Sequence, residues 1–253
     1  MPLVAAAGAV VVLVVVAIVA LHTGAGQRVD ERAMRTVVAG RETELTVLSL
    51  LGRVSIGAVL AVSAVCVVLA IMRGRIRLAV AALMVIVGAN LTTQLLKEVV
   101  LERSQLDVIA PNSLPSGHTT VVASAVGALL LVSPVALRLL VVVAGAFAVA
   151  ATGASTIVAG WHRPADIVAA LAVCLAWMAA GAIIAGGSHR PTSGVGLWSL
   201  AGAGFALVLL VAIGVRPSYG WSGFGEAAVV LGIMALVTAL AVAVMERISP
   251  TPA

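Results

Sequence analysis

Two histidines and one carboxylate stand where they could carry out nucleophilic chemistry. In the stretch GWHRPADIV, His162 is followed by Pro164 and Asp166. Proline fits the first turn of a helix, which puts Asp166 where its side chain can reach back to the residues just before that helix. Asp166 can then hold one ring nitrogen of His162 and leave the other free to attack. His118 is the second histidine, and an imidazole is well suited to protonating a leaving oxygen near neutral pH.

The residues around His118 are of the types that bind phosphate. In PNSLPSGHTT, Ser116 is a favoured N-cap, so the amides of Gly117 and His118 are predicted to be unpaired donors at a helix start. Such a helix end binds an anion, and a glycine lets the backbone approach it closely. Lys97 and Arg103, in LLKEVVLERSQLD, add positive charge and forked donors. Together these residues predict a phosphate site.

The composition places this chemistry in an integral membrane protein. The chain has 253 residues, of which 62% are hydrophobic and 10% charged, far from the balance of soluble domains. A net charge of +5 then reflects membrane topology, and nucleic-acid binding is not expected. Cys66 and Cys174 fall inside apolar runs without ligand-like spacing, so neither a disulfide nor a metal site is expected.

Apolar runs of membrane-spanning length predict an all-α, polytopic helical bundle. A bilayer core about 30 Å thick needs roughly 20 apolar residues per helix. The fourth run is short unless it extends back through Ser116. The eight runs are Leu3 to Leu21, Ile56 to Met72, Leu78 to Leu96, Thr119 to Val132, Ala136 to Ala159, Ala165 to Ala185, Leu197 to Val215 and Ala227 to Met245.

Two segments between these runs are polar or glycine-rich. The stretch from Thr23 to Arg53 mixes both charge signs with apolar residues. It is interpreted either as helix that lies at the membrane interface or caps the bundle as a lid, or as a solvated amphipathic linker. The stretch from Gly214 to Glu226 is an outer loop that either overhangs the site or simply connects the last two helices. The first run starts at the initial Met and is expected to be retained as a helix.

Basic residues suggest the orientation in the plasma membrane. With a cytoplasmic N-terminus, the inner loops hold Arg73, Arg75, Arg77, Arg138, Arg190 and Arg247, and RGRIR at 73 to 77 is the strongest positive-inside signal. The outer loops hold Lys97, Arg103, Arg163 and Arg216, so the count favours this orientation only if these outer cations serve the site. The end of the third run, the start of the fourth, the end of the fifth and the start of the sixth then meet at the extracytoplasmic face. The candidate site residues fall at these four ends.

The motifs resemble those of the type 2 phosphatidic acid phosphatase (PAP2) superfamily, and GWHRPAD looks like its actinobacterial members. The resemblance rests on PSGH at 115 to 118, on His162 with Asp166, and on Lys97 with Arg103. It implies that His162 forms a phosphohistidine, that Asp166 orients it and that His118 protonates the leaving group. The implied phosphate ligands are Lys97, Arg103, Ser116 and Gly117, and the family needs no metal or cofactor.

The chain departs from the family pattern in two places. The Lys97 to Arg103 spacing is one residue short, and Ser104 replaces the proline that usually follows the arginine. The third motif usually begins Ser-Arg, whereas here it reads Ser155-Thr156. A missing cation against a phosphoryl transition state weakens catalysis, and Arg163, next to His162, is the hypothesised substitute.

The sequence therefore predicts a membrane lipid phosphatase. Residues 1–190 are expected to form a six-helix PAP2-like catalytic unit, and residues 191–253 two additional transmembrane helices. The substrate is expected to be a lipid phosphate or a polyprenyl (pyro)phosphate in the bilayer, cleaved at the outer face during cell-envelope metabolism. The alternatives are a zinc site on His118, His162 and Asp166, and an impaired PAP2-like protein that binds or transports lipid phosphates.

Overall fold

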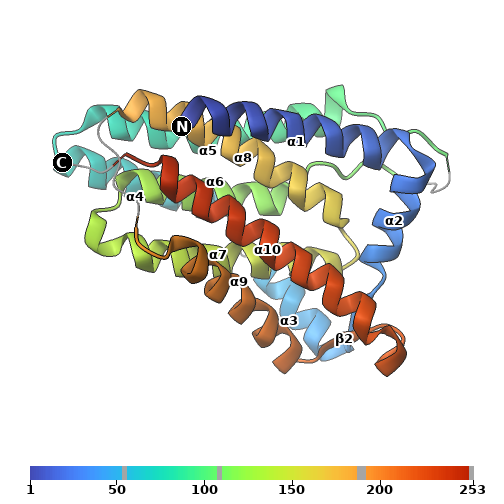
Figure 1. The fold of residues 1–253 in the computed structure, drawn as a ribbon. Coiled ribbons are helices and arrows are strands. Elements are labelled where there is room, and N and C mark those ends of the chain that lie inside the picture. The colour runs from blue at the N-terminus through green and yellow to red at the C-terminus, as the bar shows by residue number, and fades with distance from the viewer. Residues whose placement is uncertain (53–55, 107–109, 187–191, 251–253) are drawn as a thin grey trace.

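The computed structural model describes residues 1–52, 56–106, 110–186 and 192–250, and these form a helical bundle with one short two-stranded ribbon (Figure 1). His189 and Arg190 lie outside the described residues. In chain order the elements are α1 (Pro2–His22), α2 (Gly24–Met34), β1 (Val37–Ala39), α3 (Arg41–Gly52), α4 (Ile56–Met72), α5 (Ile76–Leu95), the π-helix η1 (Leu96–Val100), α6 (Gly117–Val132), α7 (Val135–Val158), α8 (Pro164–Ala185), α9 (Val195–Ala212), β2 (Val215–Pro217), the 3-10 helix η2 (Gly220–Gly223) and α10 (Phe224–Ile248).

All eight predicted apolar runs form helices, and the protein is a multi-pass membrane protein. Among the described residues, α1, α5 with η1, α7, α8, α9 and α10 are long and apolar enough to cross a bilayer. The helices α4 and α6 are shorter, with 17 and 16 residues. α6 does not extend back through Ser116, because the Ser116 side chain caps it by accepting a hydrogen bond from the Thr119 amide.

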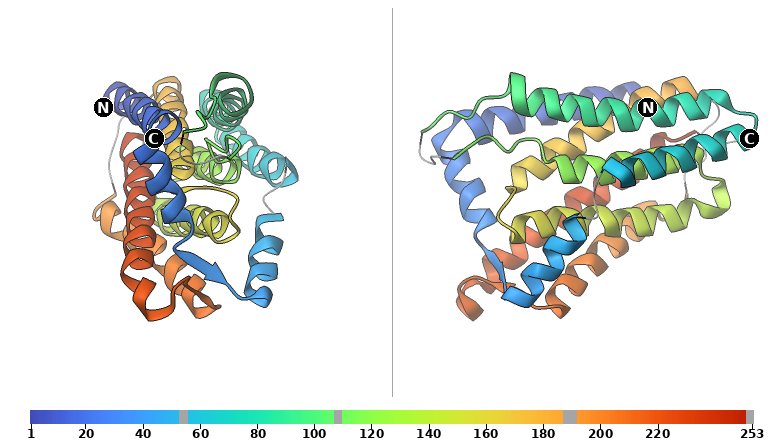
Figure 2. Two further views of the ribbon diagram at one scale, coloured as in Figure 1. Left: turned by 90° about the vertical axis from the view of Figure 1, so that its right-hand side faces the viewer. Right: turned by 180° about the vertical axis from the view of Figure 1, so that it is seen from behind.

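Helix α8 is the centre of the bundle and packs against α1, α5, α6 and α10 (Figures 1 and 2). Small residues allow the helices to approach closely, as expected in membrane bundles. Gly88 faces the Trp177 ring, and Gly202 lies against the Val143 backbone. A methyl group added at either position would meet those atoms at under 3 Å.

The two C-terminal helices are packed onto this bundle. α9 lies along α7, and α10 contacts α6, α7, α8 and α9. The apolar core is continuous from α5 and α8 to residues such as Ala203 in α9 and Met245 in α10. The helices predicted as additional are thus in direct contact with the helices that carry the motifs.

The mixed-charge segment forms structure that caps one end of the bundle. Helix α2 packs on the start of α8 and buries Gln27 and Asp30, so this part of the segment is not a solvated linker. Strand β1 pairs in antiparallel fashion with β2, Val38 opposite Arg216. Neither strand was predicted, because three residues show no usable alternation and the partner comes from the other end of the chain.

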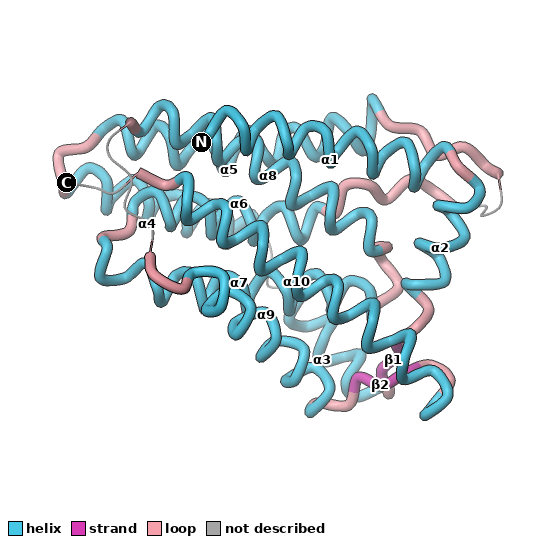
Figure 3. The backbone as a smooth tube through the Cα atoms, in the orientation of Figure 1, coloured by secondary structure: helices cyan, strands magenta, loops and turns pink. Residues whose placement is uncertain are grey.

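The four helix ends expected to share a face do so. The η1 end of α5, the start of α6, the end of α7 and the start of α8 all lie at the right-hand end of the bundle in Figure 1, and Figure 3 shows the loops that gather there beside α2. The candidate site residues are therefore brought to one end of the molecule.

Candidate active site

His162 and Asp166 form the predicted pair. The turn after α7 brings the His162 amide within 3.2 Å of the Thr156 carbonyl oxygen, and α8 then begins at Pro164. His162 Nδ1 lies 3.1 Å from Asp166 Oδ2. Both side chains are buried, with His162 6% exposed and Asp166 0%. With Nδ1 held by the carboxylate, Nε2 is the ring nitrogen left to act on a substrate.

One carboxylate oxygen of Asp166 accepts several hydrogen bonds. Besides His162, Asp166 Oδ2 accepts hydrogen bonds from the Arg163 amide at 2.9 Å and from the Ser113 hydroxyl at 2.6 Å. The second oxygen, Oδ1, is buried without a hydrogen-bond partner among the described residues. The carboxylate is therefore oriented by its Oδ2 contacts.

Arg163 turns its guanidinium toward α2 and the loop before α6. Its Nε donates to Glu31 Oε2 at 2.8 Å, and its Nη1 donates to the Ser113 hydroxyl oxygen at 3.1 Å. The side chain of Arg163 is 7% exposed and that of Glu31 13%. Burial raises the pKa of Glu31, but hydrogen bonds from Arg35 and Arg163 lower it more, so its net direction is downward.

His118 faces His162 across the site. The two ring centroids are 6.4 Å apart with the planes inclined at 65°, so the rings lie near each other without stacking face to face. The Trp161 ring also lies beside His118, with ring centroids 5.4 Å apart, and Trp161 is 44% exposed.

The start of α6 is fixed to the start of α8. The Ser116 amide donates to the Asp166 carbonyl oxygen at 2.9 Å, and the Ser116 side chain caps α6. At Gly117, the nearest atom to an added methyl group would be Gln94 Nε2 at 3.9 Å, so there is room beside the Gly117 Cα atom. A helix N-terminus with a glycine in its first turn suits an anion.

Arg103 carries a buried guanidinium without a hydrogen-bond partner among the described residues. The residue is 6% exposed, and within the described part of the chain Nε, Nη1 and Nη2 are all buried and unpaired. Burial lowers the pKa of Arg103 and the charge of Arg163 lowers it further, while Asp166, Asp30 and Glu31 act in the opposite direction. Because unpaired buried charges are expensive, the Arg103 guanidinium is expected to attract an anion.

Lys97 lies in η1, where the helix widens before the chain leaves it. Lys97 is half-buried, and its carbonyl oxygen accepts a hydrogen bond from Asn112 Nδ2, which also donates to the Leu101 carbonyl oxygen at 2.9 Å. Asn112 therefore ties the loop before Ser116 to the segment that carries Lys97.

Thr156 occupies the position where the family pattern has arginine. Its side chain is fully buried, and its hydroxyl donates to the Gly153 carbonyl oxygen at 2.7 Å. Its own carbonyl oxygen accepts from the amides of Trp161 and His162. Thr156 thus supports the turn beneath His162 through its backbone, and its hydroxyl is used within α7.

Helix α2 contributes site neighbours that the sequence reasoning missed. Asp30 Oδ1 accepts a hydrogen bond from the Ala165 amide at 2.9 Å, and burial raises the pKa of Asp30 to about 7. Gln27 donates to the carbonyl oxygens of Leu21 and Ser104, which anchors the loop next to Arg103. Asp30 and Glu31 could have been identified as site neighbours only if α2 had been known to face the arginines of the site.

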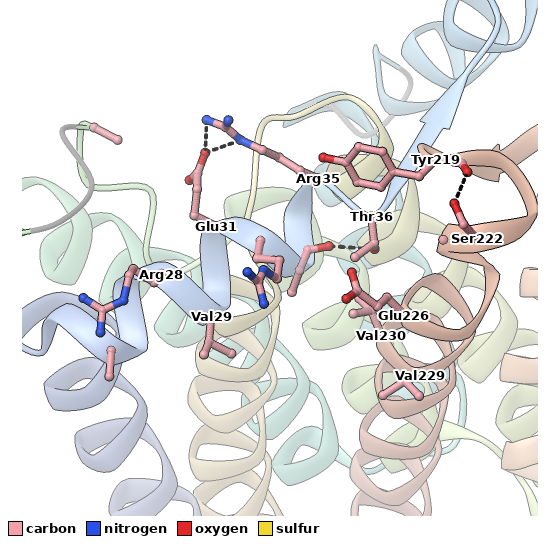
Figure 4. A pocket seen from close by; sticks show the side chains of 15 residues that line it. Arg28, Val29, Glu31, Arg35, Thr36, Tyr219, Ser222, Glu226, Val229 and Val230 are labelled. Carbon is pink, nitrogen blue, oxygen red and sulfur yellow. Dashed lines mark hydrogen bonds and ion pairs between the residues drawn. The ribbon is translucent and has the colours of Figure 1, made fainter.

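A cavity of about 1230 Å³ lies between α2, η2 and α10. Its lining includes Glu31, Arg35, Tyr219 and Glu226, and Figure 4 shows Arg35 reaching over to Glu31. Glu31 Oε1 accepts from Arg35 Nε at 2.9 Å, whereas Oε2 accepts from Arg163. The Gly-rich segment from Gly214 to Glu226 therefore borders this cavity. Glu31 lines the cavity and also binds Arg163, the residue next to His162.

The described residues contain no group of three His, Cys, Asp or Glu side chains arranged to hold a metal ion. His118, His162 and Asp166 are neighbours, but the Asp166 oxygen that faces His162 is already occupied by hydrogen-bond donors.

Comparison with known proteins gives one match. Residues 78–190 match the family model of the PAP2 superfamily, a segment that contains every candidate site residue named from the sequence. No curated protein and no solved structure matches the chain.

Proposed function

Since the chain belongs to the PAP2 superfamily through residues 78–190, we propose that it hydrolyses a lipid phosphate or a polyprenyl (pyro)phosphate through a phosphohistidine on His162. Membership of the superfamily indicates a phosphatase that acts on phosphate esters. The observation that carries the proposal is the Arg103 guanidinium, which is buried without a hydrogen-bond partner among the described residues and lies within electrostatic range of Asp166, the carboxylate that holds His162. A phosphate is an anion whose oxygens suit those forked donors.

The proposed reaction has two steps. His162 Nε2 attacks phosphorus, the bond from phosphorus to the leaving oxygen breaks, and His118 gives that oxygen its proton. Water then attacks the phosphohistidine, His118 takes the proton from the water, and phosphate leaves with His162 restored. Asp166 stabilises the positive charge that develops on the His162 ring while the P–N bond exists.

The proposed phosphate ligands are Arg103, Lys97 and the amides at the start of α6, with Ser116 and Gly117 at that helix end. Arg163 is proposed to add positive charge beside His162. Arg163 Nε and Nη1 already donate to Glu31 and Ser113. Arg103 is therefore the stronger candidate for binding two phosphate oxygens with its guanidinium. Donors held in place before the reaction lower the barrier because they need no reorganisation when charge develops.

Substrate hydrolysis is measured on the full-length protein purified in detergent. The panel is phosphatidic acid, phosphatidylglycerol phosphate, farnesyl phosphate and farnesyl pyrophosphate, with released phosphate as the readout. Wild type is expected to release phosphate from at least one of them, and His162→Ala and Asp166→Asn to lose most of that activity. Undiminished turnover in His162→Ala would refute the mechanism, and inactivity of wild type on the whole panel would favour a binding role.

The site is proposed to face the extracytoplasmic side of the plasma membrane. The turn between α4 and α5, at the opposite end of the bundle, carries Arg73 and Arg75, as the positive-inside rule expects of the cytoplasmic end. Cys66 and Cys174 are buried, so introduced cysteines report sidedness. In intact cells, an impermeant maleimide is expected to label Trp221→Cys and not Arg247→Cys. The reverse pattern would overturn the orientation.

A further inference from the structure

Glu31, on α2, lies outside residues 78–190 yet is connected to Asp166 by a chain of hydrogen bonds. Arg163 Nε donates to Glu31 at 2.8 Å, and Arg163 Nη1 donates to the Ser113 oxygen at 3.1 Å. The Ser113 hydroxyl then donates to Asp166 Oδ2 at 2.6 Å, and that same oxygen faces His162 Nδ1 at 3.1 Å.

The direction of each bond in this chain is determined by its charged ends. A guanidinium has donors only, so the Ser113 oxygen must accept from Arg163. The Ser113 proton is then left to donate, and the carboxylate of Asp166 can only accept it. Charged groups at both ends strengthen such a chain of hydrogen bonds and fix the orientation of the Ser113 hydroxyl between them.

Glu31 determines where the Arg163 guanidinium is held. Arg163 is 6% exposed, so its charge is largely removed from water and needs an acceptor. Glu31 is its ion-pair partner among the described residues. Without that carboxylate, the guanidinium would turn toward solvent or another acceptor, and Ser113 would lose the donor that fixes its hydroxyl.

We propose that Glu31, acting through Arg163 and Ser113, is a positioning residue that fixes the Asp166 carboxylate and thereby the His162 ring for attack. The inference rests on the phosphohistidine mechanism proposed above. Glu31 does not touch substrate in this scheme. Its loss is expected to lower the turnover rate and to leave substrate affinity nearly unchanged, because the phosphate ligands on α6 and at Arg103 stay in place.

The test compares Glu31→Ala with Glu31→Gln in purified full-length protein, with phosphatidic acid and farnesyl pyrophosphate in detergent micelles as probes. Glu31→Ala is expected to lower kcat about 10- to 100-fold, the range seen when supporting partners are removed or reacting groups are misplaced, with KM within about twofold of wild type. Glu31→Gln keeps an acceptor oxygen for Arg163 Nε and is expected to retain most of kcat. This rescue distinguishes positioning from a simple loss of negative charge.

Two further variants test the order of the chain. Ser113→Ala removes the hydroxyl that connects Arg163 to Asp166. If Glu31 acts only through this hydroxyl, the kcat of Glu31→Ala/Ser113→Ala should be no lower than that of the slower single variant. Arg35→Ala is the matched control, because Arg35 binds the other oxygen of Glu31 and is exposed. It is expected to retain wild-type kcat, and thermal unfolding of every variant checks that the fold is intact.

The outcomes separate the two proposals. Full activity of Glu31→Ala beside an inactive His162→Ala would overturn the positioning role and leave the proposed function standing. A folded Glu31→Ala with unchanged kcat and raised KM would also overturn it, because that pattern belongs to a binding residue. Additive losses in the double variant would show that the residues act separately. Inactivity of wild type on both probes would overturn both proposals.

Discussion

Replacement of Arg103 by methionine is expected to stabilise the unliganded protein while removing most of its activity. The guanidinium is 6% exposed, and its three nitrogens are buried without hydrogen-bond partners among the described residues. Leaving one buried polar group unsatisfied costs about 1–3 kcal/mol, and more when it is charged. Asp166, Asp30 and Glu31 offset part of that cost through their charges.

The expected magnitudes follow from these opposing contributions. Methionine fills a similar length without charge, so we expect a net stabilisation of about 1–2 kcal/mol, or a rise in melting temperature of about 2–8 °C for a chain of this size. Loss of one donor to a developing negative charge costs about 10²- to 10³-fold in kcat. Arg103→Lys keeps the charge but not the fork, and is expected to fall between wild type and Arg103→Met.

The assay is thermal unfolding in detergent, with and without inorganic phosphate, beside turnover of the lipid panel. Phosphate is expected to raise the melting temperature of wild type, because a ligand present at about 100 times its Kd adds about 2.7 kcal/mol. It is expected to raise that of Arg103→Met much less. Arg216→Met, an exposed arginine on β2 at the same end of the bundle, is the matched control.

One result would refute the reasoning. If Arg103→Met unfolded at a lower temperature than wild type and kept the full phosphate-induced shift, the guanidinium would be satisfied in the unliganded protein and would not bind phosphate. A loss of activity in that variant would then need another explanation.

Three further predictions concern other positions. Thr156→Val is expected to keep turnover within about threefold of wild type, because the hydroxyl bonds to Gly153 inside α7 and one neutral hydrogen bond contributes about 1 kcal/mol; a loss of 100-fold in phosphate release would contradict this. Asp30→Asn keeps an acceptor for the Ala165 amide and removes a carboxyl group whose pKa burial raises to about 7. Between about pH 4 and pH 7 the folded wild type therefore holds a proton that the unfolded chain has released. The melting temperature of wild type should fall relative to that of Asp30→Asn across this range and stay lower above it. An equal pH dependence of both proteins would count against it. His118→Asn is expected to slow the release of the leaving group in a single turnover far more for farnesyl phosphate than for p-nitrophenyl phosphate, whose leaving group needs no proton. Equal slowing of this first step for both substrates would remove His118 from the acid role.

The features that were predictable from the sequence are those with local causes. Hydropathy located every apolar helix, because each must supply its own lipid-facing surface and backbone hydrogen bonds. The Ser116 cap and the approach of Asp166 to His162 depend on residues three or four positions apart in the chain. Such contacts follow from helix geometry and need no knowledge of the rest of the fold.

The features that were missed depend on packing between distant segments. Nothing in the local pattern of Asp30 and Glu31 shows that α2 lies over the start of α8. The direction of the Arg163 side chain could not be read from its adjacency to His162, because it is determined by Glu31 and Ser113. Strands β1 and β2 were not predicted for the same reason, because each three-residue strand is stabilised by hydrogen bonds to a partner far away in the sequence.

The anchoring of α2 also determines which truncated forms of this protein are useful for expression. A fragment that starts at residue 78 would keep the segment matched by the family model, including Lys97, Arg103, His118, His162 and Asp166. It would lose Gln27, which holds the carbonyl oxygen of Ser104, and Asp30, which accepts from the Ala165 amide. Sequence similarity thus marks the reacting groups, whereas the smallest piece worth producing for enzymology begins with α1 and α2.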